Sequence, residues 1–206
     1  MSRPPPGAGT ALLALHYQND VLHPEGKIRV GLAADSPTRD RLVAAAEALL
    51  NRARARAMPI VHVRVAYRED GADIITNAPI FRNVAKIGAV QEGSWGAQFY
   101  SSLAPMVNNG REFVVKHSRI NAFFGSQLEE ILRVLGVSRL LVAGVATHSV
   151  VESTVRHAVD MGFEASVAAD ACSAADPAVH RASLHSMSLI AQILDTEALE
   201  RNYPLA

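Results

Sequence analysis

Residues 139–161, RLLVAGVATHSVVESTVRHAVDM, place a short apolar strand directly before a helix. Arg139–Ala143 is a bounded apolar run of the kind that forms a buried strand, and Val150–Met161 has apolar residues at helical spacing. Parallel strands need a crossover connection, which is usually a helix. This stretch therefore predicts one unit of a parallel α/β sheet.

The same alternation continues on both sides of this unit. Further strands are predicted at Thr10–Leu15, Ile60–Val65, Glu112–Lys116 and Glu164–Ala169, and further helices at Arg39–Ala57, Ser126–Leu135 and Pro177–Leu194. Strands that alternate with helices indicate βαβ units with right-handed crossovers. We therefore expect a three-layer α/β/α sandwich with a mostly parallel sheet, in which residues 1–206 form a single domain.

One segment does not fit the alternation. Glu69–Ser102 contains Gly, Pro and Asn and shows no long periodicity. A surface excursion of this length is usually functional. We expect it to serve as a lid over a site or as a contact between subunits.

Composition excludes several classes of function. Of the 206 residues, 49% are hydrophobic and 19% charged, which favours a sizeable core over disorder. Lys plus Arg and Asp plus Glu number 20 each, so nothing indicates binding to nucleic acid or to an anionic membrane. No apolar run has the length of a bilayer span, and the first residues lack the core of a signal peptide. A cytoplasmic protein is predicted, in agreement with a single cysteine, Cys172, that has no internal disulfide partner.

Three chemically capable residues lie at or just beyond predicted strand ends. These are His16, Lys116 and His148. In parallel α/β sheets, ligands bind beyond the carboxyl ends of the strands. We therefore expect the three residues to gather near one rim of the sheet. No glycine-rich phosphate-binding pattern follows any strand, which disfavours a dinucleotide site and leaves no cofactor predicted.

Three segments together resemble the isochorismatase-like superfamily, the cysteine hydrolases that include the nicotinamidases. They are ALLALHYQND (11–20), VVKHSRINAFFGSQL (114–128) and LLVAGVATHSVVEST (140–154). Most members hold Asp, Lys and Cys at three places that read His16, Lys116 and Val150 here. The resemblance implies the α/β/α fold, a small-molecule substrate, and assembly as a homodimer or homotetramer.

Lys116 and His16 are the two candidates for chemistry that the resemblance selects. Lys116 is either a retained cation that orients substrate or a lysine in a structural ion pair. His16 is either a replacement proton carrier or a half-buried histidine bonded to the backbone. A positive charge on Lys116 beside His16 would keep the imidazole neutral and favour a substrate with a carboxylate.

Val150 stands where the family nucleophile would be. A valine cannot attack a carbonyl, so a covalent thioester at this position is excluded. The resemblance implies that backbone amides around Ala146 and Val150 form an oxyanion hole. Cys172 is interpreted as a small buried cysteine, and Ser149 is expected to direct its side chain away from the nucleophile position.

The resemblance also implies further site residues. His148 lies two places before the missing cysteine, where isochorismatases, which lack that cysteine, typically have a histidine. Tyr17, Trp95, Phe123 and Ser149 are candidates to line the substrate pocket, although Trp95 could equally pack at a subunit interface. The Asp-x-His motif of metal-binding nicotinamidases is absent, so no required metal is expected.

Two functions remain open from the sequence. The first is a hydrolase for a small carboxylated or cyclic molecule, with water as nucleophile, His16 as proton carrier and Lys116 as orienting cation. The second is a pseudoenzyme that binds a metabolite or a partner without turnover.

Overall fold

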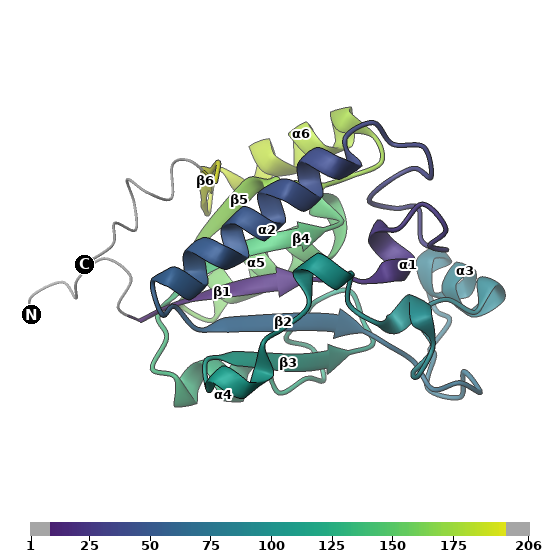
Figure 1. Ribbon diagram of the computed structural model, residues 1–206, viewed down its shortest axis with the longest axis horizontal. Helices are drawn as coiled ribbons and strands as arrows, with labels where there is room; N and C mark the ends of the chain where they lie inside the picture. The colour runs from purple at the N-terminus through teal and green to yellow at the C-terminus, as the bar shows by residue number, and fades with distance from the viewer. Residues whose placement is uncertain (1–8, 197–206) are drawn as a thin grey trace, which may run out of the picture.

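The computed structural model describes residues 9–196 and has a six-stranded parallel sheet at its centre, in the order β3-β2-β1-β4-β5-β6. The strands are β1 (Thr10–Leu15), β2 (Ile60–Val65), β3 (Glu112–His117), β4 (Arg139–Val145), β5 (Glu164–Ser173) and β6 (Gln192–Leu194). Helices cover both faces of this sheet (Figure 1). The predicted three-layer α/β/α architecture is confirmed.

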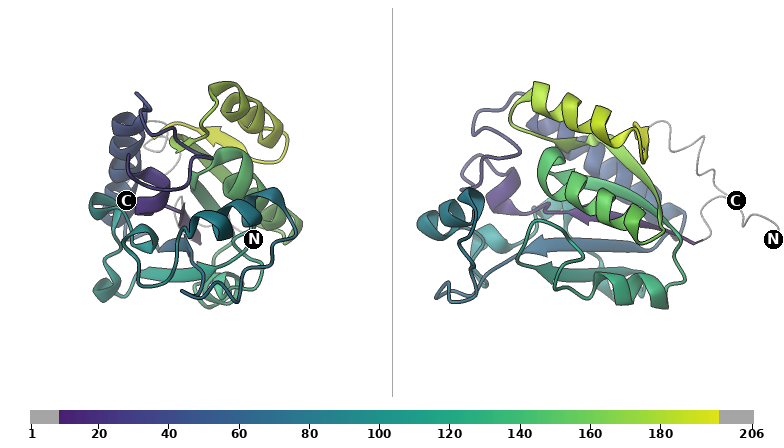
Figure 2. Two further views of the ribbon diagram at one scale, coloured as in Figure 1. Left: turned by 90° about the vertical axis from the view of Figure 1, so that its right-hand side faces the viewer. Right: turned by 180° about the vertical axis from the view of Figure 1, so that it is seen from behind.

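Between residues 9 and 196, six α-helices connect and flank the strands. They are α1 (Asn19–Leu22), α2 (Arg39–Ala55), α3 (Pro79–Ile87), α4 (Leu128–Val134), α5 (Glu152–Asp160) and α6 (Pro177–Met187). Figure 1 shows α2 across one face of the sheet, and the rear view in Figure 2 shows α4, α5 and α6 in front of the other face. The carboxyl ends of β1, β2 and β3 point toward α1 and α3 (Figure 1).

The core follows from the apolar spacing of the chain. All six residues of β1 are buried, because the strand lies between β2 and β4 and has helices on both faces. The buried apolar positions of α2 recur every three or four residues, at Leu42, Ala46, Leu49, Leu50 and Ala53. Each fully buried leucine contributes about 2 kcal/mol of transfer free energy. None of the helices within residues 9–196 has the length and apolar character needed to cross a membrane.

Two element boundaries differ clearly from the prediction. Strand β5 continues beyond Ala169 to Ser173. The helix predicted over Pro177–Leu194 ends at Met187, and Gln192–Leu194 forms β6 instead. These last residues pair with Ser166–Ala168 of β5. Backbone pairing with a neighbouring strand, which a single helical pattern does not reveal, overrides the local preference.

The excursion contains regular structure that its composition does not predict. Helix α3 begins with Pro79 in its first turn, and Gly88 ends it in the left-handed conformation (φ 57°). Three short 3₁₀ turns follow: η1 (Trp95–Ala97), η2 (Ser101–Leu103) and η3 (Val107–Asn109). Strand β3 continues one residue further than predicted, to His117. This added residue, His117, is buried, whereas Lys116 before it is exposed.

Candidate active site

His16 follows the last residue of β1 in an unusual backbone conformation. Its φ is 59°, in the left-handed region that few non-glycine residues adopt. The amide of His16 donates to the carbonyl of Val63 at 2.8 Å, and its carbonyl accepts from Gln18 at 2.8 Å. The residue is half-buried and lines a pocket at this end of the sheet. A residue held in such a conformation is a reasonable site candidate.

The polar residues after His16 fasten the surrounding loops. The buried side-chain amide of Gln18 donates to the carbonyls of Val65 and Ala97 at 2.9 Å each and accepts from the amide of Val65 at 2.8 Å. The Asp20 carboxylate accepts from the amide of Val90 at 2.7 Å. Gly96 packs against this carboxylate so closely that an added Cβ would lie 2.1 Å from it. Gln18 and Asp20 therefore hold the excursion against the end of the sheet.

The side chain that meets His16 is that of His117. The two Nε2 atoms are 2.5 Å apart, and the ring centroids are 4.8 Å apart. Nδ1 of His117 lies 3.2 Å from the carbonyl oxygen of Asn121. His117 is 2% exposed and does not line the pocket, so it contacts His16 from the protein interior.

These contacts define the tautomers of the neutral pair. A carbonyl oxygen only accepts hydrogen bonds, so Nδ1 of His117 carries the hydrogen that it donates to Asn121. Nε2 of His117 is then an acceptor, and Nε2 of His16 donates to it. The other ring nitrogen of His16 is not free, because His16 also has a hydrogen bond to the backbone of Val145.

The surroundings keep both imidazoles uncharged near neutral pH. Burial lowers the pKa of His16 well below its usual value, and His117 lowers it further, while a backbone hydrogen bond to Val145 acts in the opposite direction. Burial likewise lowers the pKa of His117 to about 4. Both rings resist protonation because an imidazolium loses hydration in a buried site.

The depressed pKa of His117 predicts a loss of stability in mild acid. The unfolded chain, with a histidine pKa near 6.5, binds the proton first, so the free energy of unfolding falls from about pH 6.5 to about pH 4. His117→Gln is expected to remove about 3 kcal/mol of that fall. Urea unfolding followed by circular dichroism from pH 7.5 to 4 measures it. His185→Gln, at an exposed position of α6, is the control and should follow the wild type. Equal pH dependence in His117→Gln and wild type would contradict the assignment.

Lys116 does not face His16, and the expectation that it would is wrong. Its ammonium lies 3.2 Å from a carboxylate oxygen of Glu92, and its side chain is 37% exposed. Successive side chains of a strand point to opposite faces. Because His117 faces His16, the preceding Lys116 must point away. The alternative of a structural ion pair describes this lysine.

The segment after β4 forms the π-helical turn η4 (Thr147–Val151) and lacks a nucleophile at the expected place. Val150 is 1% exposed and belongs to the hydrophobic core, whereas Ala146 and Ser149 line the pocket. The amides of Ser149 and Val151 donate to the carbonyl of Ala146 at 3.1 and 3.3 Å. These two amides are therefore engaged within the turn.

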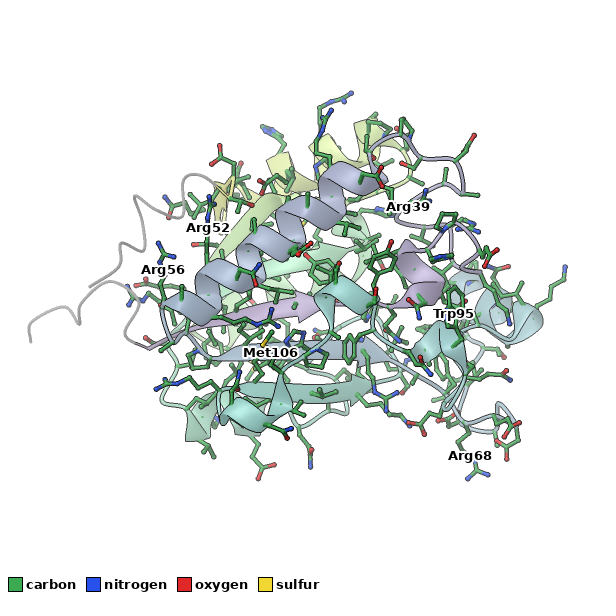
Figure 3. The ribbon with its side chains drawn as sticks, viewed as in Figure 1. Arg39, Arg52, Arg56, Arg68, Trp95 and Met106 are labelled. Atoms are coloured by element: carbon green, nitrogen blue, oxygen red, sulfur yellow. The ribbon has the colours of Figure 1, made fainter. Side chains whose placement is uncertain are left out.

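Most of the other predicted site residues lie elsewhere. His148 is exposed, and Tyr17 donates its hydroxyl to the carbonyl of Ala171 at 2.6 Å in the core. Phe123 is buried against His157 and Phe163. Trp95 is 46% exposed and meets the ring of His23 edge to face, near α1 and α3 (Figure 3). Of the four predicted pocket residues, only Ser149 lines this pocket.

The pocket lies between the end of the sheet and α3, and its walls are largely apolar. Helix α3 contributes Ile80, Phe81 and Val84, so part of the excursion covers the site, as a lid would. The other apolar residues that line it are Val21, Ile28, Val30, Val65, Tyr67, Val90, Ile120 and Val145. Polar contributions come from His16, Asn83, Arg119 and Ser149. No group of three metal-ligating side chains occurs within residues 9–196.

Sequence reasoning missed His117, although the pattern of β3 contained a signal. Phe113, Val115 and His117 alternate with Glu112, Val114 and Lys116. The first set shares one face of the strand, and Val115 and His117 are its buried members. Alternation alone therefore assigns the inward position to His117. The pocket residues of α3 have no comparable signal, because the segment around them shows no long periodicity.

Comparisons with known proteins agree with this architecture. The isochorismatase domain family matches residues 10–198. A probable inactive nicotinamidase of Arabidopsis thaliana is 30% identical over 186 residues, covering 88% of this chain and 89% of the relative. The isochorismatase family protein YecD of Escherichia coli O157:H7 is 29% identical over 191 residues, covering 92% and 94%. The crystal structure of an isochorismatase family protein from Desulfovibrio vulgaris superposes with a TM-score of 0.82 at 27% identity, covering 94% and 97%.

The match spans nearly the whole described chain and includes β1, which His16 follows, β3, which ends at His117, and turn η4. The family model covers far more than half of the sequence, and the solved structure shares the fold over 94% of this chain. This chain therefore belongs to the isochorismatase family, among the isochorismatase-like hydrolases.

Proposed function

We propose that this protein binds a small molecule in the pocket beside His16 and does not hydrolyse it through a covalent thioester. The observation that carries this proposal is the pairing of His16 with His117 beside a turn that holds Val150 in place of a thiol. The pair directs two neutral rings at each other. Val150 offers it no side chain to activate at the nucleophile position.

A thioester mechanism requires a reactive sulfur, and the chain has one cysteine. Cys172 lies in β5, is 5% exposed, and has its thiol pKa raised to about 12 by burial. A buried, protonated thiol is inert. The Arabidopsis relative, described as a probable inactive nicotinamidase, supports loss of this chemistry within the family.

The pocket itself supports binding. Apolar walls with a few polar groups at defined places are typical of small-molecule sites. The cavity volume is about 70 Å³. A cavity needs roughly 10–15 Å³ to hold a single water molecule, so this space accommodates a small ligand.

One observation favours a second candidate, hydrolysis by water. His16 is neutral and lines the pocket. Such an imidazole can act as a general base on a water molecule. In this candidate His117 positions His16 and fixes its tautomer, and Lys116 takes no part.

Turnover assays on matched variants separate the two candidates. The full chain is incubated at high concentration with small amides, carbamoyl compounds and esters, and product is followed by NMR. We expect no turnover above buffer, but chemical-shift changes from bound molecules that disappear in Ser149→Phe, which fills the pocket. Turnover that is lost in His16→Ala and retained in Lys116→Ala would establish the second candidate and overturn the first.

The same variants test the geometry. Lys116 and His117 are adjacent in sequence but lie on opposite faces of β3. If turnover exists and depends on Lys116 while His117→Ala has no effect, the arrangement described here is wrong.

A further inference from the structure

We propose that the pocket takes a small carboxylate with a compact apolar body and that Arg119 holds its anionic group. This inference rests on the binding function proposed above and specifies the class of ligand. It follows from how Arg119 is held, from the charges around the pocket, and from the size of the cavity.

Arg119 lies just beyond β3 and is fixed from three sides. Its guanidinium carbon is 3.8 Å from the centre of the Phe81 ring in α3. Nη1 donates to the carbonyl of Ile75 at 3.0 Å, and Nη2 donates to Oδ1 of Asn77 at 2.7 Å. These two bonds use two of the five N–H donors of a guanidinium. Arg119 is thus a pre-positioned cation at the pocket wall with three donors left for a ligand.

The charges around the pocket favour an anion. Arg119 is the charged side chain in the lining, and within residues 9–196 no Asp or Glu lines the pocket or forms an ion pair with it. Burial and Asp73 raise the pKa of Tyr67 while Arg119 lowers it, and the Asp73 carboxylate accepts a hydrogen bond from the amide of Arg68. His16 stays uncharged and adds no second cation. A single positive charge beside apolar walls is best balanced by one negative charge on the ligand.

The donor geometry selects a carboxylate among small anions with an organic body. The planar guanidinium presents its N–H groups as a fork that matches two carboxylate oxygens. Stacking on Phe81 holds that plane in a fixed orientation. Little side-chain entropy is then lost when the ligand binds.

The cavity limits the size of the apolar body. An engineered cavity of about 150 Å³ accommodates a benzene ring. This cavity, at about 70 Å³, is about half as large. A branched chain of roughly four carbons fits that space better than a six-membered ring, because every carbon must find room between close-packed walls.

The test uses isovalerate and its neutral counterpart isovaleramide, which share one branched body. Binding to the full-length protein is measured by isothermal titration calorimetry at pH 7.5 and located by NMR. We expect isovalerate to bind at least about tenfold more tightly than isovaleramide, in line with a charge-assisted pair. Benzoate is expected to bind more weakly than isovalerate because its ring exceeds the cavity.

Two variants separate the charge of Arg119 from its role in holding the excursion. Arg119→Gln removes the cation and is expected to abolish the preference for isovalerate over isovaleramide. Asn77→Ala removes one of the same hydrogen bonds but leaves the guanidinium in place. It is expected to keep at least about fivefold preference, because the charge remains.

The outcomes are distinguishable. Equal binding of isovalerate and isovaleramide in the pocket would overturn the carboxylate inference and leave the binding function intact. Failure of all three probes to perturb the pocket residues would count against both. Retention of the preference in Arg119→Gln would show that another group holds the anion and would overturn the role of Arg119.

Discussion

Replacing Glu112 by glutamine is expected to lower the free energy of unfolding by about 3 kcal/mol at pH 7, because it breaks a buried charge network. Glu112 is 4% exposed and begins β3. Its carboxylate accepts from Arg54 at 2.9 and 3.1 Å and from the ring of His62 at 2.8 Å. The amide of Met106 adds a bond at 2.9 Å. Glutamine would leave Arg54 without its counter-charge and turn an amide donor toward other donors.

The pH dependence of this effect has a defined sign. Burial opposes ionisation of Glu112, but the hydrogen bonds from Arg54, Met106 and His62, together with one from Asn109, outweigh it and lower its pKa to about 2. The stabilising contribution is therefore complete above the unfolded pKa near 4.5 and is lost as the pH falls toward 2. This window lies below that of His117, so urea titrations at successive pH values separate the two groups.

Glu92→Gln is the matched control for Glu112→Gln. Glu92 also meets two cations, Arg64 at 3.1 Å and Lys116 at 3.2 Å, but its side chain is 40% exposed. Surface pairs contribute under about 1 kcal/mol because water screens them. Similar destabilisation by both substitutions would show that burial does not set the strength of the Glu112 network.

The second large effect is the chemical inertness of Cys172. With a pKa of about 12, roughly one molecule in ten thousand carries the thiolate at pH 8. A free thiol with a pKa near 8.5 is ionised in roughly one molecule in four. Since the thiolate is the reactive form, we expect iodoacetamide to modify native Cys172 at least about a thousandfold more slowly than the unfolded chain.

Mass spectrometry of the native and urea-unfolded protein measures this protection. Ser101→Cys, which introduces an exposed thiol in η2, serves as the control and should react at a single site under native conditions. Rapid modification of Cys172 in the folded protein would contradict its assigned burial. It would also reopen the possibility of thiol chemistry.

The spacing of apolar residues predicted the layers of this fold, because the spacing within each strand or helix shows which of its faces are buried. The continuous apolar run of β1 matches a strand with helices on both faces, and the leucines and alanines of α2 mark its inward face. The short strand β6 escaped prediction because it exists through pairing with β5. Helix α3 escaped because its nine residues lie within a segment punctuated by Gly, Pro and Asn.

The candidate site was predicted less completely than the fold. Its location at the carboxyl ends of the strands follows from topology, and His16 and Ser149 were found in the pocket. Lys116 was selected because its segment resembles one of the family. The alternation of side chains along β3 instead directs Lys116 toward Glu92. Arg119 carried no motif, and its importance depends on contacts with Phe81, Ile75 and Asn77.

By itself, the sequence determined the α/β architecture, the valine at position 150 and the imidazole after β1, because these depend on local periodicity and on the identity of single residues. Only the tertiary structure decided that His117 meets His16 and that Arg119 stands over Phe81. Such contacts join segments about forty to a hundred residues apart. Their partners are set by the register of neighbouring strands and by loop packing, neither of which local periodicity encodes.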